Sequence, residues 1–571
     1  MTGPKPIPLP DAPGLDAPAA DDPLSESLAR PRPSPTHHQP SANRPSLIRS
    51  SMVVSSLTMV SRLLGFMRDL AISYTMGASF SPAADAYNTA LAFPNLFRRI
   101  FAEGAFAAAF VPAYSKALAK DGEEVADVLA GDAMAVLAAA TIVITVVAQL
   151  TMPWLMYIIN PGYAHDPVKF KLAVLLTQIA MPYLPCMAIY AHLSGVLNAR
   201  GRFVVYALAP SLLNVGMLLA VLPQHDARSA AIAASWGVLG AGVAQVALLT
   251  WGVKKSGAAV HWSLPRLTPD VKMLIGKAIP GAAAASATQI NIFISGILAS
   301  QTPGARSWLA VADRLYQLPL GLVGVAMGVA LLPRLSQAAQ AKDHAGGQAA
   351  MDEAIGFSLA LTLPAAAALI AMPFFLIDGM FTRGQFHVID AQNTAHALLW
   401  YGVGTPAFVL QQLFSRAFFA RGDTKTPMKF AMVSVVVNIV AGLTLFHLIG
   451  FAGIAAATAL ASWLNVTMMA ATLQTQDHYS PSWETIVRLR KLIAASAVMG
   501  VVMALASWLR PHFQHLLLRK EIAVGFTVIV GAAVYVALLF ALKAVSKAEI
   551  KAALKRTPKA KGAPPPAGEL G

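Results

Sequence analysis

Long apolar segments recur along almost the whole chain, and they constrain its fold more than any other feature. Fourteen of them reach the length of about 20 residues that a helix needs to cross a bilayer. Only 12% of the 571 residues are charged, too few to cover the surfaces of several soluble domains. Backbone polar groups in hydrocarbon must pair within the protein, which favours helices. We therefore predict an all-α polytopic membrane protein with about fourteen transmembrane helices, near 53–76, 84–112, 128–159, 170–197, 204–224, 229–253, 270–300, 308–334, 352–376, 392–418, 427–447, 452–473, 488–508 and 519–543.

Both ends of the sequence differ in composition from the apolar part. The first 45 residues hold 12 of the 38 prolines. A segment of this kind buries too little apolar surface to offset its chain entropy, so residues 1–46 are expected to be a disordered extension. Residues 546–571 are basic and proline-rich, and we expect them to form a cytoplasmic tail.

Lysine and arginine are distributed unevenly between the expected loops. With a cytoplasmic N-terminus, the inner loops and the C-terminal tail hold 25 of them and the outer loops hold eight. This asymmetry predicts that both termini are cytoplasmic, in a multi-pass protein of a bacterial inner membrane. The net charge of +15 then faces anionic lipid, so no nucleic-acid partner is expected.

Two parts of the chain resemble each other at a spacing of 221 residues. The segment 110–117 recurs at 331–338, and Ala199-Arg200-Gly201 recurs as Ala420-Arg421-Gly422. An offset of six spans preserves orientation, which predicts two parallel six-helix lobes. We place the lobes at 47–255 and 256–474, followed by two further helices in 475–545. Lobes of this kind enclose a substrate cavity and transport by rocking against each other.

Arginines inside expected spans are the most informative residues. A charge near the bilayer centre costs about 2.5–3.5 kcal/mol, so five arginines facing lipid would cost on the order of 12–17 kcal/mol. They are therefore expected to face the interior. We predict that four of them line one cavity: Arg62, Arg68, Arg98 and Arg314. Supporting positions are assigned to Asp85, Asn95, Arg99, Glu103 and Asp313.

Ion pairing is the alternative explanation for these charges. Arg99 and Glu103 are four residues apart and are expected to pair on one helix face. Arg68 and Asp69 are adjacent and point about 100° apart, so they are not expected to face each other. Asp85 could pair with an arginine of another helix.

The planar guanidinium group of arginine binds phosphate through two hydrogen bonds, so a cavity with several arginines indicates an anionic ligand, with phosphate the leading candidate.

Four segments carry a resemblance to a known family: SSLTMVSRLLGFMRDL, AFPNLFRRIFAEGAFAAAFVPAYS, ADRLYQLPLGLVGVAMGVALLPRLS and FFARGDTKTPMKFA. They resemble the MurJ (MviN) family, bacterial lipid II flippases of the multidrug/oligosaccharidyl-lipid/polysaccharide exporter superfamily. The similarity runs from about Leu47 to about Lys551.

The resemblance implies a cationic central cavity for the diphosphate-sugar-peptide head of lipid II. It also implies a groove beside the last two helices for the polyprenyl tail. The functional arginines of the family fall on Arg62, Arg68, Arg98 and Arg314, and its acidic residue at the start of the second helix falls on Asp85. Cell-wall synthesis proteins are possible partners.

No cofactor or metal is expected. The only cysteine is Cys186, and no Gly-x4-Gly-Lys-Ser/Thr loop is present, so nucleotide-driven transport is not predicted. Coupling to the membrane potential or to a monovalent ion is the expected energy source.

Two other classes of function were weighed. The first is an exporter of another lipid-linked oligosaccharide or of drugs. The second is an enzyme of lipid-linked sugar polymerisation, which the longest outer loop disfavours. That loop, 377–391, offers only Asp378, His387 and Asp390, with no spacing typical of a metal or acid–base site. We therefore predict a transporter rather than an enzyme.

Overall fold

The computed structural model describes residues 47–98, 106–341, 343–512 and 519–544. Nearly all of them belong to one compact unit that begins at Ser50, and the description below concerns that unit. Within the described residues every regular element is a helix, as the apolar segments predict. The expectation of an all-α fold is confirmed.

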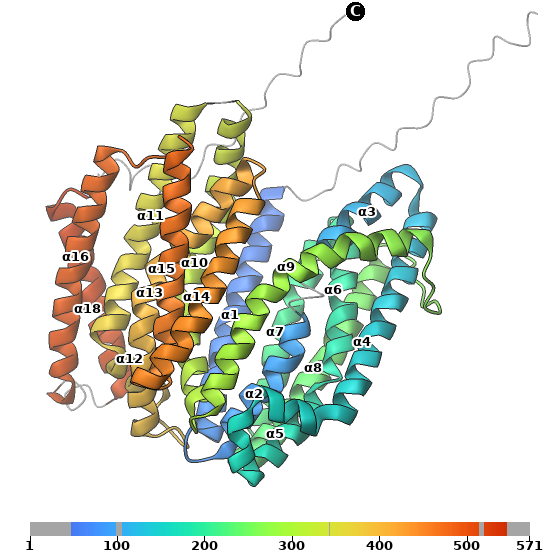
Figure 1. Ribbon diagram of the computed structural model, residues 1–571, viewed down its shortest axis with the longest axis horizontal. Coiled ribbons are helices and arrows are strands. Elements are labelled where there is room, and N and C mark those ends of the chain that lie inside the picture. Colours follow the sequence, from blue (N-terminus) through green and yellow to red (C-terminus); the bar gives the residue numbers. More distant parts are fainter. Residues whose placement is uncertain (1–46, 99–105, 342, 513–518, 545–571) are drawn as a thin grey trace, which may run out of the picture. The chain divides into compact units, whose positions relative to one another are not determined.

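In the first half of the chain, the described residues form eight α-helices and a short 3-10 helix (Figure 1). They are α1 (Leu47–Met76), α2 (Pro82–Arg98), α3 (Phe106–Lys120), α4 (Glu123–Ile159), η3 (Pro161–His165), α5 (Pro167–Ala180), α6 (Tyr183–Ala199), α7 (Phe203–Val221) and α8 (Ala227–Lys255).

The second half continues with nine described helices. They are α9 (Pro269–Ser300), α10 (Ala305–Gln340), α11 (His344–Ala371), α12 (Pro373–Phe381), α13 (Val388–Ala420), α14 (Lys425–Ile449), α15 (Ala452–Thr475), α16 (Trp483–Trp508) and α18 (Lys520–Ala541).

Each of the fourteen expected spans lies on one helix or on two consecutive helices. Counting α5 and α6 as one, nine described spans are long and apolar enough to cross a membrane, and α1 and α10, which carry charge, are not among them. Three spans expected as single helices are divided. The helices α5 and α6 separate at Pro182, and α11 and α12 separate at Pro373, because proline removes a backbone donor. The expected span 84–112 is shared between α2 and α3, and residues 99–105 lie outside the described part.

The internal repeat has a structural counterpart. Arg200 and Arg421 each cap the C-terminus of a helix, and the glycines that follow have φ of 71° at Gly201 and 77° at Gly422. The amide of Asn214 on α7 donates to the Ser61 carbonyl of α1 at 2.8 Å. The amide of Asn438 on α14 donates to Asn291 Oδ1 of α9 at 2.7 Å. An asparagine of the fifth span thus bonds the first span, and an asparagine of the eleventh span bonds the seventh, which is consistent with parallel repeats although the acceptors differ.

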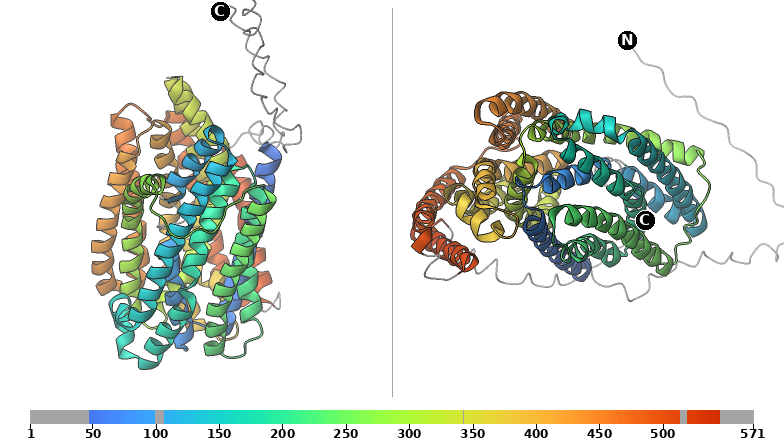
Figure 2. Two further views of the ribbon diagram at one scale, coloured as in Figure 1. Left: turned by 90° about the vertical axis from the view of Figure 1, so that its right-hand side faces the viewer. Right: turned by 90° about the horizontal axis from the view of Figure 1, so that it is seen from below.

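The helices form two groups, α2 to α8 and α10 to α18 (Figures 1 and 2). Apolar cores within each group hold the helices together, for example around Tyr87 in the first and Phe375 in the second. Helix α9 crosses obliquely between the groups (Figure 1). It packs against α3 and α4 of one group and against α14 and α15 of the other. Helix α9 therefore links the two groups. The boundary between the lobes predicted from sequence, 47–255 and 256–474, assigns it to the second lobe.

Candidate functional site

A cavity of about 680 Å³ lies where helices α1, α7, α10 and α13 meet. Three of the four arginines predicted to share a cavity line it: Arg62 and Arg68 from α1, and Arg314 from α10. A fourth arginine, Arg416 of α13, also lines it. The remaining lining residues are mostly polar or small: Ser61, Gly65, Phe66, Asn214, Tyr316, Gln317, Leu318, Leu320, Gly321 and Gln412.

Helical spacing explains why α1 contributes several of these residues. Positions 61, 62, 65 and 68 recur at three- and four-residue intervals, so they share one face of the helix. On the opposite wall, Gly321 leaves room for the Arg62 side chain, because a Cβ there would overlap its guanidinium. A larger residue at 321 would therefore displace the end of the Arg62 side chain from its present position.

Asp69 joins two of the cavity arginines. Its Oδ1 atom lies 2.7 Å from Arg68 Nη2, and its Oδ2 atom lies 2.5 Å from Arg314 Nε. The expectation that adjacent Arg68 and Asp69 do not face each other is wrong, because the long arginine side chain bends back to the neighbouring carboxylate. Asp69 was not among the predicted site residues, and it ties α1 to α10.

Asn214 of α7 fixes the orientation of Arg68. Arg68 Nη1 donates to Asn214 Oδ1 at 3.0 Å, while the Asn214 amide is anchored on the Ser61 carbonyl. Arg68 is therefore held by one carboxylate and one amide, with its guanidinium at the cavity wall.

The other predicted site residues have different positions. Arg98 is the last residue of α2, and its side chain lies outside the described part of the structure, as do Arg99 and Glu103 entirely. Asn95 is half-buried on α2 and does not line the cavity. Asp313 accepts a hydrogen bond from Gln317, which does line the cavity.

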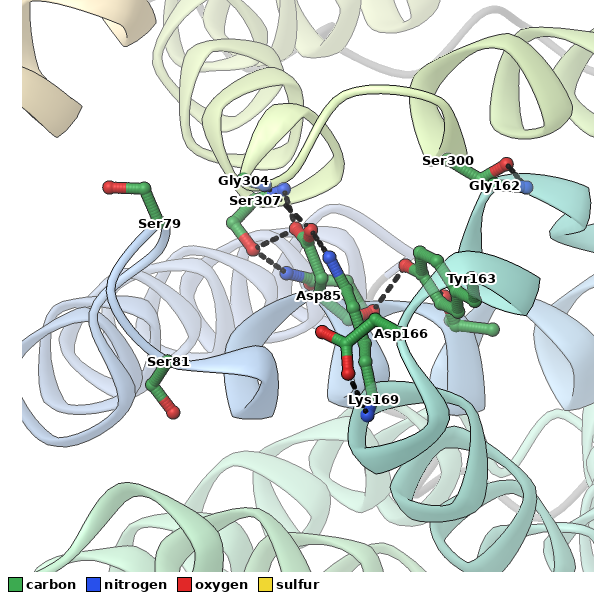
Figure 3. A network of polar contacts seen from close by, with 12 residues as sticks. Ser79, Ser81, Asp85, Gly162, Tyr163, Asp166, Lys169, Ser300, Gly304 and Ser307 are labelled. Carbon is green, nitrogen blue, oxygen red and sulfur yellow. Dashed lines mark hydrogen bonds and ion pairs between the residues drawn. The ribbon is translucent and has the colours of Figure 1, made fainter.

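Asp85 lies in a separate polar network, shown in Figure 3. Its Oδ2 atom pairs with Lys169 Nζ of α5 at 2.5 Å and accepts the Gly304 N–H at 2.8 Å. Its Oδ1 atom accepts the backbone N–H and the hydroxyl of Ser307 at 3.0 and 2.8 Å. The expected pairing of Asp85 with an arginine is therefore wrong. The partners are a lysine and the N-terminus of α10, where the helix dipole also favours a carboxylate.

Asp390 makes a second connection at the same end of the bundle. Its Oδ1 atom accepts the Trp308 indole N–H at 3.0 Å and the Ser79 backbone N–H at 3.1 Å. Ser79 follows α1, Trp308 is near the start of α10, and Asp390 is near the start of α13. Asp85 thus joins α2 and α5 of the first group to α10 of the second. Asp390 ties the segment that follows α1 to α10 and α13, also at the end predicted to be periplasmic.

A comparison with protein families decides the relationship of the chain. A family model described as "Lipid II flippase MurJ" matches residues 72–522. The chain belongs to the MurJ family. A probable lipid II flippase MurJ of Rhizobium meliloti (strain 1021) is 38% identical over 508 residues, covering 87% of this chain and 94% of that protein. The lipid II flippase MurJ of Burkholderia cenocepacia is 32% identical over 452 residues, covering 78% and 87%.

Solved structures agree on the fold. A lipid II flippase MurJ in an inward closed conformation superposes with a TM-score of 0.69 at 23% identity, covering 85% of this chain and 98% of that one. An inward-facing transporter of the MATE family, at 14% identity, gives a TM-score of 0.62 and covers 75% and 98%. MurJ membership and the apolar helices make this chain a multi-pass protein of the bacterial inner membrane.

Arg416 is the cavity residue that sequence reasoning missed. It lies two residues before the end of the expected span 392–418 and four residues before the end of α13, where a charge is typical of the end of a membrane span rather than of a cavity. Gln412 and Arg416 are four residues apart and share a helix face, and this spacing was the available signal.

Proposed function

We propose that this chain flips lipid II from the cytoplasmic to the periplasmic leaflet for cell-wall synthesis. The observation that carries the proposal is the single cavity into which α1 and α10 direct Arg62, Arg68 and Arg314. Membership of the MurJ family, and the similarity to flippases of Rhizobium meliloti and Burkholderia cenocepacia, support the same function.

The chemistry of the cavity fits an anionic head group. A guanidinium stays charged when desolvated and offers two parallel donors to phosphate oxygens. Asp69 neutralises one charge of the Arg68–Arg314 pair and holds both side chains at the wall. The cluster of two arginines and one aspartate keeps a net positive charge, which favours an anionic head group. A cavity for organic cations would instead require carboxylates without arginine partners.

Movement of the head group requires the outer side to open. In the structure, the Asp85 network joins the two groups of helices on the predicted periplasmic side, and Asp390 ties the segment after α1 to α10 and α13 there. We propose that cargo enters from the cytoplasmic leaflet, and that opening on the other side breaks these contacts. The groove beside α16 and α18 would hold the polyprenyl tail.

Orientation and energy source belong to the same proposal. Both termini are cytoplasmic, because the inner loops and the C-terminal tail hold 25 lysines and arginines against eight outside. An inside-negative potential favours outward movement of an anionic head, so flipping depends on the potential and uses no nucleotide. Cell-wall synthesis proteins would take up the product on the periplasmic side.

The test is a reversible lock between the two groups of helices. The Asn88 amide of α2 donates to the Ser307 hydroxyl of α10 at 3.2 Å, so these two positions are chosen for the cysteine pair. The variant Asn88→Cys/Ser307→Cys, in a Cys186→Ser background, replaces the flippase of a bacterium depleted of its own. Oxidation should stop growth and leave lipid II on the cytoplasmic side, and a reductant should reverse both effects.

Each single-cysteine variant is the matched control and should be insensitive to oxidation. Undiminished periplasmic lipid II in the bridged protein would refute alternating access. Failure of the unmodified chain to replace the depleted flippase would favour an exporter of another lipid-linked oligosaccharide.

A further inference from the structure

Arg416 differs from the other cavity arginines in its surroundings. Its Nη1 atom is buried and has no hydrogen-bond acceptor among the described residues. Gln412 lies one helical turn earlier and lines the same cavity. A buried guanidinium N–H without an acceptor is costly, so this wall suits a ligand that brings an acceptor.

The position of Arg416 separates it from the Arg68–Asp69–Arg314 cluster. Helices α10 and α13 run in the same direction, since Trp308 near the start of one bonds Asp390 near the start of the other. The ring of Tyr316 on α10 packs 4.8 Å from Tyr401 and 5.0 Å from Phe408 on α13, measured between centroids. Tyr316 therefore marks a common level on the two helices.

The separation follows from the rise of a helix. Arg314 lies two residues before Tyr316, while Arg416 lies eight residues after Phe408 and 15 after Tyr401. At 1.5 Å per residue, the Cα atoms of Arg314 and Arg416 are about 15–25 Å apart along the helix axes. One compact diphosphate bound to Arg68 and Arg314 would leave Arg416 for another group.

We propose that Arg416 and Gln412 form a second subsite, which binds a carboxylate on the peptide of the head group. This inference rests on the proposed function. An extended peptide covers about 3.3–3.6 Å per residue, so four to seven residues bridge the gap. The guanidinium pairs with a carboxylate through its fork, and the Gln412 amide offers a further donor. The diphosphate is held deep in the cavity, and the peptide trails toward the cytoplasmic mouth.

The experiment compares two forms of lipid II that differ in one group. One has a free carboxylate at the end of its peptide, and the other has a carboxamide there. Affinities are measured for the full chain in lipid nanodiscs. Arg416→Gln should weaken binding of the free acid about tenfold and leave the amide unchanged. Arg314→Gln should weaken both forms. Arg266→Gln, which removes an exposed loop arginine, is the matched control.

Every other outcome overturns the subsite. Equal losses for acid and amide would place Arg416 on the diphosphate, and no loss for either would make it a structural residue. Flipping of lipid II would stand in both cases. If the unmodified chain binds neither form, the proposed function falls together with the subsite.

A second variant covers the case in which Arg416→Gln does not fold. Gln412→Glu keeps Arg416 and places a carboxylate beside it. This variant should weaken binding of the lipid II with a free carboxylate, by repulsion between the two carboxylates, and leave binding of the carboxamide form unchanged. Equal affinity for both forms in this variant would also overturn the subsite.

Discussion

The ion pairs of Asp69 allow a quantitative test of how the cavity is built. Asp69 contacts Arg68 at 2.7 Å and Arg314 at 2.5 Å, but the two arginines differ in exposure. The side chains of Arg68 and Asp69 are 11% and 17% exposed, whereas that of Arg314 is 42% exposed. A hydrogen bond to a charged group in a mostly buried site contributes about 1.5–3 kcal/mol. An exposed ion pair contributes about 0.2–1 kcal/mol.

Two double-mutant cycles measure these contributions separately. One combines Asp69→Asn with Arg68→Gln, and the other combines Asp69→Asn with Arg314→Gln. The free energy of unfolding is measured by denaturant titration in mixed micelles. We expect a coupling free energy of about 1.5–3 kcal/mol for the Arg68 pair and below about 1 kcal/mol for the Arg314 pair.

The order of the two couplings is the decisive result. A larger coupling for Arg314 than for Arg68, or none for either, would refute the reasoning. It would mean that exposure does not decide the strength of these pairs. Arg266→Gln combined with Asp69→Asn is the distant control and should give no coupling.

Three further predictions concern shape, burial and pH. Arg68→Lys and Arg314→Lys keep the charge but lose the planar fork, so growth of a flippase-depleted bacterium should be rescued poorly at normal membrane levels. Lys169→Met leaves the Asp85 carboxylate buried without its cation, which should lower the free energy of unfolding by about 3–5 kcal/mol. The Thr426 hydroxyl and backbone N–H hydrogen-bond to the Asp423 carboxylate in the turn before α14 and hold its pKa below its usual value. This contribution is present at neutral pH and is lost as the pH falls through the lowered pKa. The protection factor of the Thr426 amide, which is the exchange rate of an unstructured peptide divided by that of the amide at the same pH, should therefore fall below about pH 4.

Each of these predictions has its own control. Full rescue by both lysine variants would mean that the arginines act only as a diffuse positive field. Asp85→Asn combined with Lys169→Met should recover part of the lost stability, and no recovery would argue against an uncompensated charge as the cause. The variant Asp423→Asn should remove the acid dependence of the Thr426 protection factor, and an unchanged acid dependence would assign it to another group.

Local properties of the sequence were enough to predict the class of fold and part of the site. The length and hydropathy of the segments predict membrane helices, because the bilayer imposes a fixed thickness and leaves no water for backbone groups. The cost of a charge in hydrocarbon places Arg62, Arg68 and Arg314 in the interior, and the structure brings them to one cavity. The repeat at Arg200 and Arg421 also has the same local geometry in both halves.

The partners of each charge were decided only by the tertiary structure. Asp85 and Lys169 are 84 residues apart in sequence, and Asp69 reaches Arg314 across two helices. Arg416 lies near the end of its expected span, and the hydropathy pattern does not show in which direction a side chain points. Only the packing of α13 against its neighbours places Arg416 at the cavity. The tilt and rotation of a helix depend on its packing against neighbouring helices. The sequence of one segment therefore cannot predict which charges pair between helices.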